Sequence, residues 1–414
     1  MNNIKQQKNL FHILAKYIDL KTFFICFGLV LFGLLSLYSA TVSFDPELDR
    51  FYRQFLYAMI GFGILFITAN LPTNLIKSAA IPFYLATCLL LILVLFFGTE
   101  VYGTKGWLRF GGWSLQPSEF AKISLVLVIA KHLSKRGNNV ANIWDLGIII
   151  GYFLLPFVLI NLQPDFGTAL VFLVVFIGIL FWGGFDAFYI VLLIACGIMF
   201  IASLTSSTLA IVVGFVSGLG LLFFRKKIII YLVGLSVVIS MAFFSQYFYD
   251  SLAIHQKARI DVFINPGSDP QGAGYNVIQS ILAVGSGGIT GKGYMEGTLT
   301  QLRYIPMQWT DFIFSVPAEE FGFIGAVIVL FFLLALVYRG INIAANSKDA
   351  FNSVIAFGAS TIFIFHIAVN IGMVLGVLPV MGIPLPFLSY GGSSLLSNLI
   401  LGGLLMNIHR NNLK

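Results

Sequence analysis

Long apolar stretches separated by short polar ones run along almost the whole chain. Most of them are close to the length of about 20 residues that a helix needs to cross the hydrocarbon core of a bilayer. The pattern predicts an all-α integral membrane protein, a polytopic bundle of about 10 to 12 transmembrane helices. The expected spans lie near residues 22–43, 54–70, 79–98, 118–133, 146–162, 166–184, 187–204, 208–224, 228–247, 317–338, 350–376 and 388–408.

The composition argues against a soluble protein. Hydrophobic residues make up 58% of the 414 residues and charged residues only 10%, whereas a soluble globular domain is about one-quarter charged. A water-soluble fold of this length cannot bury so much apolar surface, so the solvent around the chain is lipid. No separate soluble domain is evident, and we expect residues 1–414 to form a single transmembrane domain.

The net charge of +7 would suit a nucleic-acid-binding protein only if the positions of the charges were ignored. Basic residues occur in the N-terminal arm, in alternate loops and in the C-terminal tail, which is the pattern of cytoplasmic segments in helical membrane proteins. We therefore expect no nucleic-acid partner. An even number of spans places both termini in the cytoplasm, and the loops at 44–53, 99–117, 163–165, 248–311 and 377–387 then face outward.

The pair of stretches at 187–204 and 208–224 is the least secure part of this topology. Both are short, so the pair either spans the membrane as a hairpin or is re-entrant. Removing it as a unit leaves the orientation of every other span unchanged.

The longest polar segment, at about 248–311, ends in Asp311. Apolar residues near 275–284 follow a spacing that suits an amphipathic helix inside this loop. Beyond Asp311 the chain becomes apolar again, and a carboxylate at such a boundary is costly unless it is used or paired. A functional site on the outer face is the first hypothesis. The alternative is that Asp311 only caps the following helix.

A second polar group follows the outward loop at 99–117. Pro117 fits the first turn of a helix, and Glu119 and Lys122, three residues apart, share one helical face. They are either a local ion pair in a capped helix or a charged pair that lines an outward cavity, since intramembrane charges are rare outside functional sites.

Two further charges also permit two interpretations. Asp165 closes the next outer hairpin and is either an N-cap or a member of the same cavity. Arg53 precedes the second span and either extends to the interface or binds an anion. Between residues 378 and 394, three prolines and a Gly-Gly-Ser-Ser run that includes Ser393 interrupt an apolar region. Broken helices of this kind commonly line a cavity.

These segments, taken in order, resemble the SEDS family of shape, elongation, division and sporulation proteins, and within it the RodA branch. The resemblance covers roughly residues 20 to 410. It rests on the motifs Gln116-Pro117-Ser118-Glu119-x-x-Lys122, Gln163-Pro164-Asp165-x-Gly167-Thr168, Asp269-Pro270-x-Gly272-x-Gly274-Tyr275, Gly285-Ser286-Gly287-Gly288, Thr310-Asp311-Phe312-Ile313-Phe314, Glu319-Glu320-x-Gly322 and Pro384-Leu385-Pro386 before Ser389-Tyr390-Gly391-Gly392-Ser393.

The resemblance implies a peptidoglycan glycosyltransferase of the bacterial cytoplasmic membrane. Such proteins polymerise lipid II at the outer face, with a class B penicillin-binding protein as transpeptidase partner. It also implies a role in cell elongation beside other elongation-complex membrane proteins. The essential aspartate of the family matches Asp311, and further cavity positions match Lys122, Glu119 and Asp165.

Two departures from the family stand out. An arginine often precedes the Trp of the second outer loop, whereas here Gly106 precedes Trp107, which leaves Lys105 or Arg109 as substitutes. Family members usually have ten spans, and the hairpin at 187–224 is additional.

The implied chemistry requires a base for the acceptor hydroxyl and a positive environment for the leaving pyrophosphate. Asp311 suits the first role. Lys122, with Arg53 or Arg109, suits the second, together with a divalent cation such as Mg²⁺ or Mn²⁺ whose site the sequence does not locate. The alternatives are a flippase or transporter of lipid-linked precursors and a non-catalytic scaffold for a penicillin-binding protein.

Overall fold

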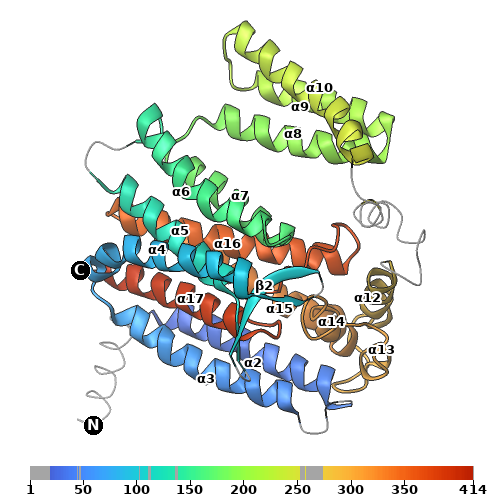
Figure 1. Ribbon diagram of the computed structural model, residues 1–414. Coiled ribbons are helices and arrows are strands. Elements are labelled where there is room, and N and C mark those ends of the chain that lie inside the picture. The colour runs from blue at the N-terminus through green and yellow to red at the C-terminus, as the bar shows by residue number, and fades with distance from the viewer. Residues whose placement is uncertain are drawn as a thin grey trace, which may run out of the picture. The chain divides into compact units, whose positions relative to one another are not determined.

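The computed structural model describes residues 19–43, 45, 48–101, 103–110, 113–135, 139–251, 257 and 274–413. Within them every predicted span corresponds to a helix (Figure 1). These helices are α2 (Leu20–Val42), α3 (Asp49–Asn70), α4 (Thr73–Phe97), α5 (Pro117–Leu133), α6 (Ile143–Asn161), α7 (Phe166–Trp182), α8 (Ala187–Thr205), α9 (Ser207–Leu222), α10 (Ile228–Ser251), α15 (Gly322–Ala345), α16 (Ala350–Val374) and α17 (Gly392–Asn412).

The helices have the dimensions of a membrane protein. Among the described residues, eight are long and apolar enough to cross a bilayer: α2, α3, α4, α6, α8, α10, α15 and α16. The apolar helices α7 and α9 are shorter. The protein is thus a multi-pass membrane protein, as the hydropathy pattern predicted.

The helices α5 and α17 lie inside the bundle formed by residues 1–179 and 276–414. The helix α17 packs along α3, and α5 packs against α4 and α16 (Figure 1). Small residues make this close packing possible. A Cβ atom added to Gly403 would lie 2.7 Å from the carbonyl oxygen of Leu65 on α3, so a larger residue there would force the two helices apart.

The loop at 99–117 contains a small antiparallel sheet that the sequence analysis did not predict. Its strands are β1 (Thr99–Val101), β2 (Thr104–Phe110) and β3 (Trp113–Leu115), in the order β1-β2-β3. Gly103, with φ of +81°, permits the tight turn between β1 and β2. The sheet leads directly into α5 and so positions the start of the helix that carries Glu119 and Lys122.

The long loop at 248–311 contains an amphipathic helix, as predicted, in the form of α12 (Tyr275–Ser286). On this helix Val277, Ser280 and Ala283 face inward, whereas Ile281 and Leu282, two of the apolar residues near 275–284, are exposed. Ser280 Oγ donates to the carbonyl oxygen of Val374 at 2.9 Å, and this bond holds Ser280 on the inner face. The short helices α13 (Thr298–Gln301) and α14 (Ser315–Glu320) follow. The Asp269 to Gly272 part of the predicted motifs lies outside the described residues.

Residues 180–275 form a second compact unit, which contains α8, α9 and α10. Its core consists of Phe188, Ala195, Met199, Leu221 and Val238. Asp186, at the start of α8, forms an ion pair with Lys226, which lies between α9 and α10. The predicted hairpin is therefore helical, and whether it crosses the membrane stays a prediction, because α9 is only 16 residues long.

Candidate functional site

Asp311 lies in the turn between α13 and α14 with a free carboxylate. The side chain is half-buried, and within the described chain its oxygens have no hydrogen-bond or ion-pair partner. Burial raises the pKa of this carboxyl group to about 6, because the charged form loses solvation. The capping alternative is wrong, since Phe314 occupies the N-cap position of α14 and Phe321 that of α15.

The backbone around Asp311 is tied to the segment between α16 and α17. Asn370 Nδ2 donates to the carbonyl oxygens of Asp311 and Ile383, each at 2.8 Å. Ser389 Oγ donates to the carbonyl of Thr310 at 2.7 Å, and the Tyr390 N–H donates to the carbonyl of Trp309 at 2.8 Å. Residues 375–391 are non-helical, as their prolines predicted, and the Ser389 side chain and the Tyr390 backbone bind the loop that presents Asp311.

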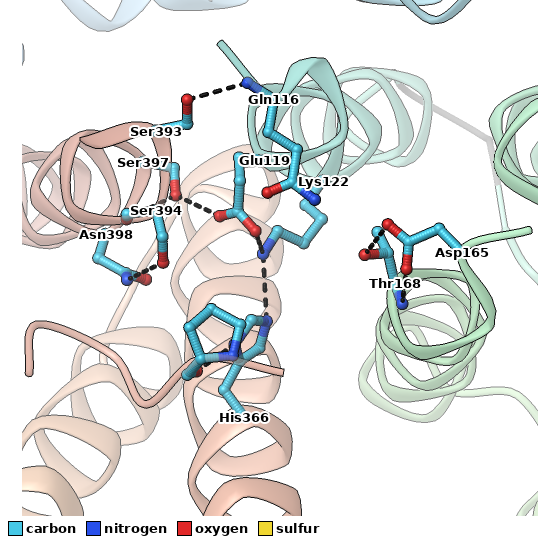
Figure 2. A network of polar contacts seen from close by, with 11 residues as sticks. Gln116, Glu119, Lys122, Asp165, Thr168, His366, Ser393, Ser394, Ser397 and Asn398 are labelled. Atoms are coloured by element: carbon cyan, nitrogen blue, oxygen red, sulfur yellow. Dashed lines mark hydrogen bonds and ion pairs between the residues drawn. The ribbon is translucent and has the colours of Figure 1, made fainter. Parts of the chain in front are cut away.

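Glu119 and Lys122 form a buried ion pair on the first turns of α5 (Figure 2). Lys122 Nζ lies 3.0 Å from Glu119 Oε1, and the side chains of Lys122 and Glu119 are only 2% and 4% exposed. Ser397 Oγ on α17 donates to Glu119 Oε2 at 2.8 Å. The pair is therefore more than a surface contact on one helix: α17 contributes to it, and buried charges persist only when paired and hydrogen-bonded in this way.

His366 on α16 is the third member of this group, and the sequence analysis missed it. Its Nε2 atom lies 3.1 Å from Lys122 Nζ, and its Nδ1 atom lies 3.1 Å from the carbonyl oxygen of Pro384. An ammonium group only donates and a carbonyl only accepts, so we assign the neutral tautomer with the proton on Nδ1. The available signal was a titratable residue inside an apolar span, which is a functional-site candidate in a membrane protein.

Asp165 caps α7. Its Oδ1 atom accepts from the Thr168 N–H at 3.0 Å, and its Oδ2 atom accepts from Thr168 Oγ1 at 2.8 Å. Burial raises the pKa of Asp165 despite these bonds. Figure 2 shows Asp165 directed at Thr168 and apart from the Glu119–Lys122 pair. The N-cap interpretation is confirmed, while a contact with substrate stays a prediction.

The side chains of the candidate cations Lys105 and Arg109 form no bond with Asp165 in the described part of the chain. Lys105 Nζ donates to the carbonyl oxygen of Leu95 at 2.9 Å, and Arg109 is exposed on β2. A Cβ atom on Gly106 would lie 3.8 Å from Asp165 Oδ2. The residue position where the family often carries arginine therefore abuts Asp165. The Lys105 backbone N–H donates to the carbonyl oxygen of Gln163 at 3.1 Å, two residues before Asp165. Among the described residues, neither the Lys105 nor the Arg109 side chain bonds to Asp165 itself.

Arg53 is partly exposed and pairs with Asp49, its Nε lying 2.8 Å from Asp49 Oδ1. The adjacent Arg50 lies closer to the site in one respect, because its guanidinium carbon is 5.0 Å from the ring centre of Trp309. Trp309 precedes Asp311 by two residues. Sequence reasoning missed Arg50, whose only signal was its position in the same polar segment as Arg53.

Ser393 lies at the start of α17 and connects two elements of the site. Its Oγ accepts from the Gln116 N–H at 3.0 Å, directly before α5 (Figure 2). It therefore joins α17 to the beginning of the helix that carries Lys122. A direct contact with substrate stays a prediction.

The described part of the chain brings together no group of three or more His, Cys, Asp or Glu side chains that could hold a metal ion. A dedicated protein cage for a cation is therefore not formed by these residues. A magnesium ion held mainly by phosphate oxygens and water needs only one or two carboxylates, and the free carboxylate of Asp311 fits that smaller role.

The chain is similar to proteins of one family over nearly its whole length. The model of the FtsW/RodA/SpoVE family, described as cell cycle protein, matches residues 16–211 and 203–414. The peptidoglycan glycosyltransferase MrdB of Escherichia coli strain K12 is 33% identical, covering 95% of this chain and 94% of that protein. The peptidoglycan glycosyltransferase RodA of Treponema pallidum is 32% identical, covering 91% of this chain and 94% of that protein.

Solved structures agree with these relatives. A chain of a peptidoglycan synthase complex, studied for its coordination of polymerization and crosslinking, has a TM-score of 0.72 at 30% identity, covering 95% of this chain and 98% of that chain. The rod shape determining protein RodA of Thermus thermophilus has a TM-score of 0.63 at 28% identity, covering 95% of this chain and 97% of that chain.

Proposed function

This chain belongs to the FtsW/RodA/SpoVE family of cell cycle proteins, and on that premise we propose that it is a peptidoglycan glycosyltransferase. Its substrate is lipid II, which it polymerises into glycan strands at the outer face of the cytoplasmic membrane. Relatives similar over more than nine-tenths of the chain carry that activity in their names. The family premise supports the reaction, and the geometry of the site supports the roles of the residues.

The free carboxylate of Asp311 is the single observation that carries the assignment of the base. An acceptor hydroxyl attacks the anomeric carbon of the donor sugar, its proton passes to Asp311, and the bond from that carbon to the pyrophosphate oxygen breaks. A base works best when its pKa lies near the working pH. Burial brings the pKa of Asp311 to about 6, which retains the charged form at neutral pH and makes it a better proton acceptor than an ordinary aspartate.

Lys122 is the candidate for binding the leaving pyrophosphate. An ammonium group has three N–H donors, and Glu119 and His366 account for two of them. One donor remains for a phosphate oxygen. In a site shielded from water, such a preorganised charge stabilises a developing anion far more than it would in bulk solvent. Arg50 and Arg53, which lie in one segment of α3, are the further candidates on the same side of the molecule as Trp309.

A divalent cation would complete the charge balance. When bound, Mg²⁺ or Mn²⁺ neutralises part of the pyrophosphate charge. Among the described residues, Asp311 is the carboxylate that would be available to such an ion as a protein ligand.

The partner we propose is a class B penicillin-binding protein, within a complex that also contains other elongation-stage membrane proteins. The similarity to a chain of a peptidoglycan synthase complex supports a transpeptidase neighbour. The bias of Lys and Arg toward alternate loops supports an orientation with both termini in the cytoplasm. A Tyr304→Cys probe, in a background with Cys196→Ser, should react with an impermeant maleimide from outside intact cells and stay unlabelled in inside-out vesicles. The reverse pattern would reject the orientation.

A flippase of lipid-linked precursors is the alternative from another functional class, because charged residues between broken helices also suit transport. The product separates the two. Purified chain in detergent has no second compartment, so glycan strands formed from lipid II under those conditions identify a transferase. Absence of strands from wild-type protein that is folded and supplied with Mg²⁺ would reject the proposed function. A non-catalytic scaffold predicts the same absence.

A further inference from the structure

Two polar side chains of α16, His366 and Asn370, contact neither the substrate nor the reacting atoms in the chemistry described so far. They are four residues apart and share one face of the helix. Both are buried within a membrane-spanning helix, where polar groups are retained for a specific use.

Both side chains bind the same short stretch of backbone. His366 Nδ1 donates to the carbonyl oxygen of Pro384 at 3.1 Å, and Asn370 Nδ2 donates to that of Ile383 at 2.8 Å. The two carbonyls are consecutive in the chain. Pro384 also lacks a backbone N–H, so this stretch has one donor fewer of its own.

The other contacts of these side chains reach the two halves of the site. His366 Nε2 accepts from Lys122 Nζ at 3.1 Å. Asn370 Nδ2 donates to the backbone carbonyl of Asp311 at 2.8 Å. A flipped amide would place Oδ1 of Asn370 against two carbonyl oxygens, so the two acceptors fix its orientation.

Asn370 Oδ1 is buried and has no hydrogen-bond partner among the described residues. An unmet buried acceptor is unfavourable, and a purely structural position would be served better by a residue whose polar atoms are all paired. In this orientation Asn370 Nδ2 binds both carbonyls, while Oδ1 has no hydrogen bond within the described chain.

We propose that His366 and Asn370 are positioning residues for glycosyl transfer, which fix Lys122 and the Asp311 loop relative to one another through the adjacent carbonyls of Ile383 and Pro384. The proposal rests on the proposed function. His366 acts through Lys122 and therefore on substrate binding. Asn370 acts through the Asp311 backbone and therefore on the chemical step.

The first test compares two substitutions of His366 in the purified full-length chain. A glutamine amide can accept from Lys122 with Oε1 and donate to Pro384 with Nε2, while leucine can do neither. His366→Leu should raise KM for lipid II about tenfold with little change in kcat, and His366→Gln should remain within about threefold of wild type. If the leucine variant does not fold, His366→Met replaces it.

The second test compares the isosteric variants Asn370→Asp and Asn407→Asp. Asn407 is a matched control, since its Nδ2 also binds buried carbonyls, those of Thr68, Ala69 and Leu71, at the opposite end of α17 from Ser393. Both variants lose the donors and should lose similar thermal stability. Asn370→Asp should lower kcat about 30-fold at nearly constant KM, and Asn407→Asp should leave both constants within about twofold.

The outcomes separate this proposal from the proposed function. Wild-type chain that makes no strands from lipid II rejects the function itself. With active wild type, the positioning proposal is overturned if the Leu (or Met) and Gln variants of His366 behave alike, or if Asn370→Asp and Asn407→Asp reduce activity equally. The positioning proposal is supported if His366→Gln keeps a KM near that of wild type and if Asn370→Asp, but not Asn407→Asp, lowers kcat.

Discussion

Asn370 holds Asp311 by its backbone carbonyl, at 2.8 Å, and leaves the carboxylate free. The loop is thereby fixed while the reactive group keeps both oxygens available. The same α16 face reaches the buried Lys122 through His366. The site therefore combines a rigid backbone around one carboxylate with a preorganised cation, which is the arrangement that general-base and electrostatic catalysis require.

Replacement of Asp311 by asparagine should abolish polymerisation while the protein folds and inserts normally. Loss of a general base typically costs about 10²- to 10⁴-fold in rate, and the amide keeps the shape of the side chain. Strand formation from lipid II by the purified variant is the measurement. Asp349→Asn serves as the control, because Asp349 only caps α16 by accepting from the Phe351 N–H and asparagine is also a good cap. Wild-type rates from Asp311→Asn would end the catalytic assignment.

The pH dependence should follow the ionisation of Asp311. A base must be deprotonated, so kcat/KM should rise about tenfold per pH unit below about pH 6, the pKa of Asp311, and level off above it. Burial also raises the pKa values of Asp165 and Glu320, so the profile is to be repeated with Asp165→Asn and Glu320→Gln. If the fall in kcat/KM at acidic pH persists in both variants, it is assigned to Asp311. If the fall disappears in either variant, it is assigned to the residue replaced there and not to Asp311.

The same pKa predicts a stability difference between wild type and Asp311→Asn. The folded pKa of about 6 lies above the ordinary 3.8, so the folded state binds the proton more tightly than the unfolded state does. Wild type should lose stability as pH rises from about 4 to 6, by up to about 3 kcal/mol. The asparagine variant lacks this loss and should be the more stable protein at pH 7 but not at pH 4. Thermal unfolding at the two pH values checks the sign.

The buried Glu119–Lys122 pair predicts an effect that separates folding from function. Lys122→Met alone leaves Glu119 as an unpaired buried charge and should cost about 3–5 kcal/mol of stability. The double variant Lys122→Met with Glu119→Gln removes both charges and should recover most of that stability. It should still use lipid II poorly, with KM raised at least tenfold, because the cation is gone. Full recovery of KM in the double variant would return Lys122 to a purely structural role.

Polymerisation should stop in EDTA and return on addition of Mg²⁺ or Mn²⁺. The expected ion is held mainly by the pyrophosphate and water, so the free protein should show no high-affinity metal binding. Calorimetric titration of Mg²⁺ with and without lipid II measures this difference. Full activity in EDTA would remove the cation from the mechanism.

The cap formed by Asp165 gives a prediction for a residue with two candidate roles. Asp165→Ala should destabilise the protein by about 0.5–2 kcal/mol, the usual effect of losing an N-cap, whereas Asp165→Asn should be nearly neutral. Thermal unfolding of the two variants tests the cap. A large loss of polymerisation by the stable asparagine variant would show that the charge itself also acts on the substrate.

The sequence alone determined the helices, the membrane environment and the family motifs. Hydrophobic runs of spanning length follow directly from the lipid solvent, so every predicted span is helical. Glu119 and Lys122 are close in the chain, and their spacing of three residues is enough to place them on one face of a helix. The prolines between residues 378 and 386 likewise indicated a break between the last two helices, because proline lacks the N–H that a helix requires.

The contacts between distant segments were decided only by the tertiary structure. His366 is 244 residues from Lys122, and an isolated histidine in an apolar run carries no mark of its partner. Asn370 meets Asp311, and Arg50 meets Trp309, although each pair is also far apart in the chain. The sheet of β1 to β3 also escaped prediction, because its short strands are set by pairing and not by a long alternating pattern. Local periodicity reports what each segment becomes, while the partner of a buried polar group is chosen by how the helices pack.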